Sequence, residues 1–205
     1  MIFSSGQLEQ LLVSDVGVFS IYLKMLTKPS SKIAAIAVLI SLFIVASTSA
    51  IELKDGRTYF ERPPRLLGVA TSQNGTYIWN ATYYFTVAIP EDAGEALQKL
   101  EIELAASPGR PIFDASKLEA FEGKRRKPGD KIPVKDVTID ARTQVISVTF
   151  DPPVKPGKTI TVRVYPVRNP AAGGTYLYGV TAFPDGAQPA SQFLGFGRIR
   201  IYDRE

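Results

Sequence analysis

The chain has 205 residues, 45% of them hydrophobic, and a formal net charge of +4 at pH 7, with no cysteine and no histidine. The missing residue types exclude disulfides, thiolate metal sites, thiol nucleophiles and every catalytic triad that needs an imidazole base. The composition is that of a globular protein, and its modest positive charge includes no tract of the size that marks a nucleic-acid-binding protein.

The most apolar stretch is residues 33–50, and its pattern is typical of an export signal. An apolar core of 14 residues from Ile33 to Ala46 is interrupted only by Ser41. Lys28 and Lys32 precede this core, and small residues follow it. A positive flank, a core of this length and a small-residue end are the three parts of a secretory signal. The pattern predicts an N-terminal hydrophobic helix that serves as a signal for export.

The end of this stretch predicts a cleavage site between Ala50 and Ile51, because small residues occupy the positions that a signal peptidase reads. The alternative is that residues 33–50 stay uncut and span the membrane as an anchor. The lysines before the core would then lie on the cytoplasmic side. Both alternatives place residues 51–205 outside the cytoplasm, in the periplasm or at the cell surface. Contact with the membrane is expected only through residues 33–50, and only if they are not removed.

The segment before the signal is unusual, because residues 1–24 are long for such a position and carry Glu9 and Asp15. A chain that starts at Met25 would have an ordinary signal over residues 25–50. We therefore expect residues 1–24 to be a gene-model extension, the alternative being a genuine N-terminal segment. The exported domain is then residues 51–205.

The clearest strand pattern lies between Tyr77 and Ile89. Every second residue is apolar or aromatic over this range, which predicts extended structure with one buried face. The predicted inward residues are Tyr77, Trp79, Ala81, Tyr83, Phe85, Val87 and Ile89. On this interpretation the single tryptophan is a core residue. The run is either one strand or two strands joined by a bend near Asn80.

Helix is expected only in short pieces. Pro90–Asp92 can form a single turn, and Leu100–Leu104 is again an alternating strand. Ser116 and Glu119 have the spacing of a capping box, and Gly123 can end a helix. These residues predict a helix of about two turns that begins near Ser116.

The rest of the chain has β character, and Pro156–Gly157 suits the centre of a type II turn. Further strands are predicted around residues 134–139, 145–150, 160–165, 173–183 and 197–202. Seven or eight short strands with little helix favour a mainly β fold, an immunoglobulin-like or related antiparallel β-sandwich. A small barrel is the alternative. Without a cystine, the core of such a sandwich must rest on aromatic and aliphatic burial.

Four phrases carry a resemblance to a known family. They are FERPPRLLGVATSQN, YYFTVAIPEDAGEALQKLEIE, FDPPVKPGKTITVRVYPVRNP and GTYLYGVTAFPDG. The chain resembles a cyanobacterial exported family catalogued as domain of unknown function 2808, over most of Glu61 to Tyr202. The resemblance implies export from a cyanobacterium, and it brings no functional residues with it.

The strongest charged feature is a run of four cations in a predicted loop before a Pro-Gly turn. The residues are Lys124, Arg125, Arg126 and Lys127. Four adjacent cations can hold an anionic polymer, a lipid head group or an acidic protein. The alternative is a solvated loop that only aids solubility.

Carboxylates offer little sign of catalysis or of metal binding. Glu101 and Glu103 share one strand face, at a spacing near that of retaining glycosidases, but this face is expected to point to open water. Asp130, Asp136 and Asp140 match no calcium-loop spacing. No catalytic residue, metal site or cofactor is predicted.

Three functions remain open on the sequence. The favoured one is a non-catalytic exported domain that acts by contact with an envelope protein or polysaccharide. The second is a carboxylate-based enzyme that acts on envelope polysaccharide. The third is a carbohydrate-binding module that stacks sugars on outward-facing tyrosines, and the candidates for these are Tyr84, Tyr165, Tyr176 and Tyr178. Neither the ligand nor the oligomeric state follows from the sequence.

Overall fold

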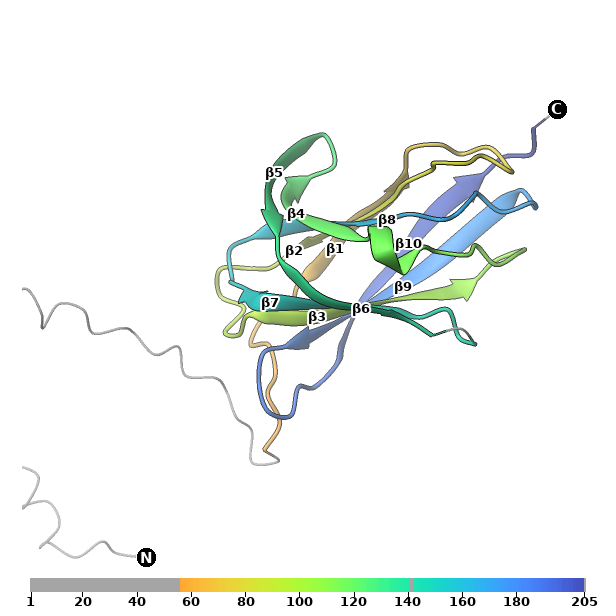
Figure 1. The fold of residues 1–205 in the computed structure, drawn as a ribbon. Helices are drawn as coiled ribbons and strands as arrows, with labels where there is room; N and C mark the ends of the chain where they lie inside the picture. Colours follow the sequence, from red (N-terminus) through yellow and green to blue (C-terminus); the bar gives the residue numbers. More distant parts are fainter. Residues whose placement is uncertain (1–55, 141, 205) are drawn as a thin grey trace, which may run out of the picture. The chain divides into compact units, whose positions relative to one another are not determined.

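Two five-stranded antiparallel sheets pack against each other in the computed structural model, which describes residues 56–140 and 142–204 (Figure 1). One sheet has the strand order β1-β2-β8-β4-β5 and the other has the order β10-β9-β3-β7-β6. The strands are β1 (Arg65–Thr71), β2 (Tyr83–Ala88), β3 (Leu97–Ala106), β4 (Glu119–Lys124), β5 (Lys127–Ile132), β6 (Val134–Ile139), β7 (Ile146–Val154), β8 (Thr159–Val164), β9 (Gly174–Pro184) and β10 (Gln192–Ile201).

The predicted antiparallel β-sandwich is therefore confirmed. The ten strands of the described residues exceed the predicted seven or eight, because β1 and β5 were not anticipated and β4 lies where a helix was predicted. One 3-10 turn, η1 (Ala115–Lys117), is the only helical element that these residues contain. The predicted hydrophobic helix of the N-terminal segment and the predicted cleavage between Ala50 and Ile51 lie outside the described residues. No helix among the described residues is long and apolar enough to span a membrane.

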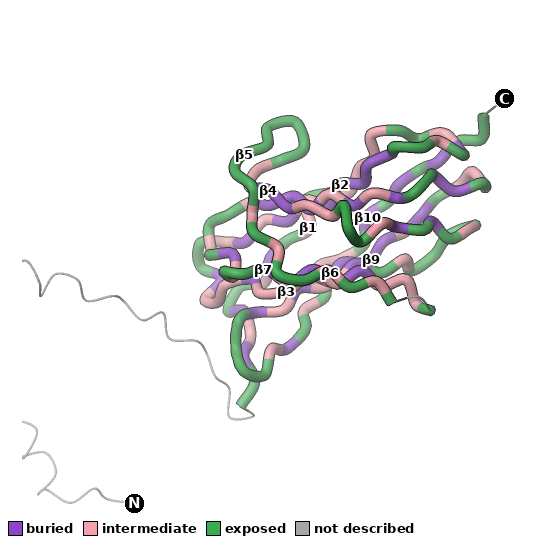
Figure 2. Tube along the Cα trace, in the orientation of Figure 1, coloured by how far each residue is buried: buried purple, intermediate pink, exposed green. Residues whose placement is uncertain are grey.

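The core lies between the sheets and follows the period of two that the sequence shows. Alternate residues of the central strands point inward, and Figure 2 shows buried positions concentrated on these strands. In the first sheet they are Tyr83, Phe85, Val87, Ile160, Val162 and Val164, and in the second they are Leu100, Ile102, Ile146, Val148, Phe150, Tyr176, Tyr178, Val180, Ala182, Ile199 and Ile201. Burial of this apolar surface is the main term that stabilises the sandwich.

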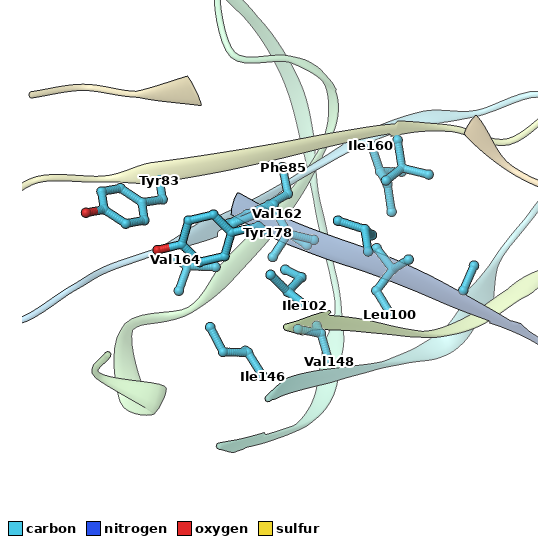
Figure 3. Packing of buried hydrophobic residues seen from close by; sticks show 14 of the residues in the cluster. Tyr83, Phe85, Leu100, Ile102, Ile146, Val148, Ile160, Val162, Val164 and Tyr178 are labelled. Carbon is cyan, nitrogen blue, oxygen red and sulfur yellow. The ribbon is translucent and has the colours of Figure 1, made fainter. Parts of the chain in front are cut away.

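Aromatic rings join the two sheets where a cystine is absent. Tyr178 of β9 packs edge-to-face against two rings of β2, with its ring centroid 5.4 Å from that of Phe85 and 6.1 Å from that of Tyr83 (Figure 3). The Tyr83 ring also meets that of Phe113 at 5.9 Å. Edge-to-face pairs add to the free energy that burial alone supplies. The cross-sheet contact therefore fixes how the sheets face each other.

The prediction that Trp79 is a core residue is wrong. The alternating pattern is buried from Ala81 onward, but β2 begins only at Tyr83, and the indole of Trp79 is 61% exposed. Tyr77 and Asn80 have φ angles of 56° and 62°, which turn the chain away from extended geometry. These two left-handed residues break the period of two, so Trp79 projects outward.

The two-turn helix predicted near Ser116 is also wrong. The side chain of Asp114 accepts the backbone N–H of Ser116 and caps η1, which ends after one turn. Glu119, expected to complete a capping box, instead pairs with Lys131 across the β4–β5 hairpin at 2.8 Å. Strand pairing to β8 buries Phe121 and its neighbour Ala120, so tertiary packing overrides the local helix signal.

Two buried tyrosine hydroxyls provide a matched test of this core. The hydroxyl of Tyr83 donates to Oδ1 of Asn169 at 3.0 Å, whereas the buried hydroxyl of Tyr178 has no partner among the described residues. An unpaired buried hydroxyl costs free energy, while a paired one contributes about 1 kcal/mol. We expect Tyr178→Phe to leave the free energy of unfolding unchanged or raised, and Tyr83→Phe to lower it by about 1 kcal/mol.

Urea unfolding of the two variants and the wild type checks this expectation. Equal losses in both variants would mean that the Tyr178 hydroxyl is satisfied in solution.

Candidate functional site

Three connecting segments gather at one end of the sandwich. Residues 72–82 precede β2, residues 107–114 follow β3, and residues 165–173 join β8 to β9. Because the strands are antiparallel, these segments emerge at the same end, on the side of the C-terminal label in Figure 1.

Backbone hydrogen bonds join the three segments. Single β-bridges pair Trp79 with Arg168 and Phe113 with Pro166. The N–H of Val167 donates to the carbonyl of Ile112 at 2.8 Å. Residues 165–170 thus lie between the other two segments and are hydrogen-bonded to both.

This end carries exposed apolar side chains that we call the Trp79 surface. Its members are Tyr77, Trp79, Ile112, Val167 and Arg168. Four of the eight large hydrophobic side chains exposed among the described residues belong to it, with exposed fractions from 46% to 69%. Exposed apolar side chains grouped in one place mark a contact site more often than single ones do.

Arg168 lies over both aromatic rings of this surface. Its guanidinium carbon is 5.4 Å from the ring centroid of Tyr77 and 6.0 Å from that of Trp79. A cation at this distance is attracted by the face of a ring. The two rings are therefore restrained by a side chain as well as by the backbone.

The Trp79 surface rests on the fully buried side-chain amide of Asn169. Its Nδ2 donates to the carbonyls of Gln73 and Gly75 at 3.0 and 2.9 Å, and its Oδ1 accepts the hydroxyl of Tyr83. Its backbone N–H donates to the carbonyl of Ile78 at 2.7 Å. One residue thus ties the loop that carries Trp79 to the core.

Backbone strain is concentrated in this loop. Tyr77 and Asn80, on either side of Trp79, are two of the three non-glycine residues with positive φ among those described. Asparagine tolerates this conformation, but tyrosine adopts it at a cost of about 1 kcal/mol or more. Such strain persists where surrounding contacts determine the conformation, and it clusters at functional sites.

A small hollow of about 220 Å³ lies beside Trp79. It is lined by Trp79, Asn80, Ala81, Asp114, Lys117, Tyr165, Pro166 and Val167. Within it, Nζ of Lys117 lies 3.1 Å from Oδ2 of Asp114. Hydrogen bonds from Ser116 and Lys117 hold the pKa of the Asp114 carboxyl below its usual range, so this group stays an acceptor at neutral pH. The hollow thus combines an aromatic wall with a paired anion and cation.

The predicted basic loop is the tip of the β4–β5 hairpin, which projects from the sandwich (Figures 1 and 2). Lys124 and Lys127 are paired across the turn, and Arg125 and Arg126 form its tip; all four are exposed. The guanidinium of Arg125 lies 4.8 Å from the ring centroid of Tyr84. The structure places these cations together, away from the Trp79 surface.

The carboxylate pair singled out in the sequence does not form a site. Glu101 lies on the outer face of β3 in an ion pair with Lys99 at 2.8 Å, and Glu103 is exposed. Among the described residues no three carboxylates are arranged so that they could hold a metal ion, and Asp130, Asp136 and Asp140 do not form such a group.

A different carboxylate cluster, missed in the sequence, lines a hollow at the opposite end of the sandwich. Glu61, Glu95 and Asp185 lie there together with Lys155. Burial raises the pKa of the Glu95 carboxyl, and the nearby charges of Asp185 and Glu61 raise it further. No aromatic side chain lines this hollow.

The tyrosines proposed for sugar stacking are mostly unsuitable. Tyr176 and Tyr178 are buried in the core, which contradicts their predicted outward orientation. Tyr84 and Tyr165 are half-buried, and of these four only Tyr165 lines the hollow beside Trp79.

Sequence reasoning also missed most of the Trp79 surface. No sequence motif marks Ile112, Arg168 or Asn169. One signal was present, because asparagine tolerates the left-handed conformation and a bend near Asn80 was one of the two predicted arrangements of this run.

The comparisons with known proteins identify a family without a known activity. The family described as "Protein of unknown function (DUF2808)" matches residues 57–201. No curated protein matches the chain.

Solved structures with similar folds include three surface-protein domains. The C-terminal domain of the Streptococcus pyogenes antigen I/II-family protein AspA is 12% identical, with a TM-score of 0.39; the match covers 73% of this chain and 44% of that domain, less than half. The collagen-binding subdomain of the Enterococcus faecalis surface protein ACE is 10% identical over 68% of this chain and 99% of its own, with a TM-score of 0.38. The collagen-binding domain of a Staphylococcus aureus adhesin is 9% identical over 60% and 88%, with a TM-score of 0.35. Similarity at this level says nothing about a shared ligand.

The role assigned to Asn169 can be tested directly. We expect Asn169→Ala to lower the free energy of unfolding by about 3 kcal/mol, because it leaves the Tyr83 hydroxyl and the carbonyls of Gln73 and Gly75 unpaired. Amide exchange at Tyr77 should accelerate at the same time. Asn74→Ala, at an exposed asparagine of the same loop, is the control and should change stability by less than about 0.5 kcal/mol. Equal effects of the two substitutions would contradict the role of Asn169.

Proposed function

The chain belongs to the DUF2808 family of proteins of unknown function, and we propose that it is a non-catalytic exported domain that acts by contact with a component of the cell envelope. The observation that carries this proposal is the rigidly held Trp79 surface. Its aromatic rings are exposed and the loop that carries them is strained. The buried amide of Asn169 holds this loop through hydrogen bonds to its backbone. A binding surface organised in this way loses little conformational entropy when a ligand arrives.

Export is the first part of the proposal, and the sequence supports it. Residues 25–50 have the order of a secretory signal, and their small-residue end predicts cleavage between Ala50 and Ile51. The intact mass of the protein from fractionated cells tests this part. We expect a chain that begins at Ile51 in the periplasmic or secreted fraction. A chain that begins at Met25 in the membrane fraction would make the segment an anchor, and a cytosolic chain would contradict export.

The basic hairpin tip is a second proposed contact, for an anionic group of the envelope. Lys124, Arg125, Arg126 and Lys127 are adjacent and exposed, and no carboxylate among the described residues forms an ion pair with any of them. Binding through them should weaken as salt is added, because exposed charges are screened within about 8 Å at physiological ionic strength. Contact through the largely apolar Trp79 surface should depend little on salt.

The enzyme alternative rests on the acidic hollow. A carboxyl with a raised pKa beside ionised carboxylates is an arrangement that glycosidases use. Glu95 has such surroundings, so this is the residue that the alternative would need.

Cosedimentation with isolated cell envelopes separates the proposals. We expect saturable binding by the full chain, binding at least about tenfold weaker for Trp79→Ala, and no change for Glu95→Gln. The control is Phe193→Ala, which removes another exposed aromatic ring from β10.

The same samples are assayed for soluble saccharide released from the envelopes. Release that Glu95→Gln abolishes would establish the enzyme and contradict the contact role. Equal binding by wild type and Trp79→Ala would remove the Trp79 surface from the account.

A further inference from the structure

We infer that the hollow beside Trp79 binds a neutral saccharide chain. This inference rests on the proposed contact function and names the ligand class for it. The hollow has the two elements that sugar recognition needs, a flat apolar wall and hydrogen-bonding groups at its side.

The apolar wall is the indole of Trp79. A pyranose ring presents a face of C–H groups, and an aromatic ring can pack against this face while the sugar hydroxyls point outward. The indole is 61% exposed, and the pairing of Trp79 with Arg168 holds its backbone. The platform therefore exists before the ligand arrives.

The polar groups of the hollow suit hydroxyls. The Asp114 carboxylate accepts hydrogen bonds, the Lys117 ammonium donates them, and the Tyr165 hydroxyl, which donates to Oε2 of Glu119 at 3.4 Å, can accept one. Each sugar hydroxyl is both a donor and an acceptor, so a paired acid and base can engage two neighbouring hydroxyls at once.

The charge of the hollow favours a neutral ligand. Asp114 and Lys117 form an ion pair at 3.1 Å, so these two charged lining residues cancel. Arg168 lies over the rings but does not line this hollow. An anionic polymer would be attracted more strongly to the exposed hairpin tip, where four cations are adjacent.

The size of the hollow fits one ring of a longer chain. Its volume of about 220 Å³ is below the range of roughly 300 to 1,000 Å³ that is usual for drug-sized ligands. A second hollow of about 320 Å³, lined by Arg110, Ile112 and Arg168 among others, shares Val167 with the first. Its two guanidiniums are hydrogen-bond donors that suit the hydroxyls of a neighbouring sugar ring. Neighbouring sugar rings can extend across Val167 into it.

Trp79 is the only tryptophan of the chain, so its fluorescence reports on this site alone. The full chain is titrated with linear neutral tetrasaccharides of glucose, mannose, galactose and N-acetylglucosamine. We expect at least one of them to give a saturable blue shift and to protect the indole from acrylamide quenching, with a dissociation constant below about 10 mM. The absence of a saturable change with all four overturns the inference.

Variants then test the assignment by NMR titration with the sugar that binds. We expect Trp79→Ala to weaken binding roughly tenfold or more, Trp79→Phe to weaken it less, and Asp114→Asn to weaken it several-fold. Phe196→Ala is the matched control, since it removes an aromatic ring that is 58% exposed on β10, and binding should not change. Unchanged binding in Trp79→Ala places the sugar elsewhere and overturns the inference.

Two further outcomes separate this inference from the function it rests on. If tetragalacturonate binds more tightly than every neutral sugar and depends on Trp79, the ligand is anionic and the inference is wrong, while the contact role stands. If no sugar binds but envelope binding still depends on Trp79, the ligand is not a saccharide and again only the inference fails. If envelope binding also ignores Trp79, both fail.

Discussion

The hydrogen bonding of the buried Asn169 amide is the interaction on which the Trp79 surface depends. Its side-chain oxygen accepts a hydrogen bond from the Tyr83 hydroxyl in the core. Its side-chain nitrogen donates hydrogen bonds to two carbonyls of the loop that carries Trp79. A buried amide with all its groups paired specifies one arrangement, because any other would leave polar groups unsatisfied. The amide therefore connects the packed core to the exposed surface, and it makes the loop conformation a property of the fold.

The core provides the fixed end of this connection. Tyr83 lies between the sheets, where its ring contacts Tyr178 of the opposite sheet and Phe113 of a neighbouring segment. Because the Tyr83 ring is packed against these two rings, the hydroxyl that donates to Asn169 has little freedom to move. Aromatic packing between the sheets thus takes the place of a cystine and also anchors the Trp79 surface. Strain at Tyr77 is tolerated because these contacts oppose its relief.

The fold could be predicted from the sequence further than the site could. Alternation in β2, β3, β8 and β10 reports local burial, so those strands and the two-sheet class followed from pattern alone. The prediction of a helix near Ser116 failed because β4 pairs with β8, a long-range interaction that the local sequence does not report. The prediction that Trp79 is buried failed for a related reason, because its exposure is set by neighbouring left-handed residues and by Asn169, which is distant in the sequence. The basic run was found because it is contiguous, whereas the Trp79 surface joins three segments that only the fold brings together.

The exposure and rigidity of Trp79 in the unliganded protein are the central claim of this account. Time-resolved fluorescence anisotropy of the folded full chain, combined with acrylamide quenching, measures both at the single tryptophan. The account predicts an indole that is quenched readily, yet whose anisotropy decays with the tumbling of the whole molecule and without a fast local component. An indole protected from the quencher would contradict its exposure. A dominant fast decay would show that the loop is not held, and the preorganised surface would then not exist.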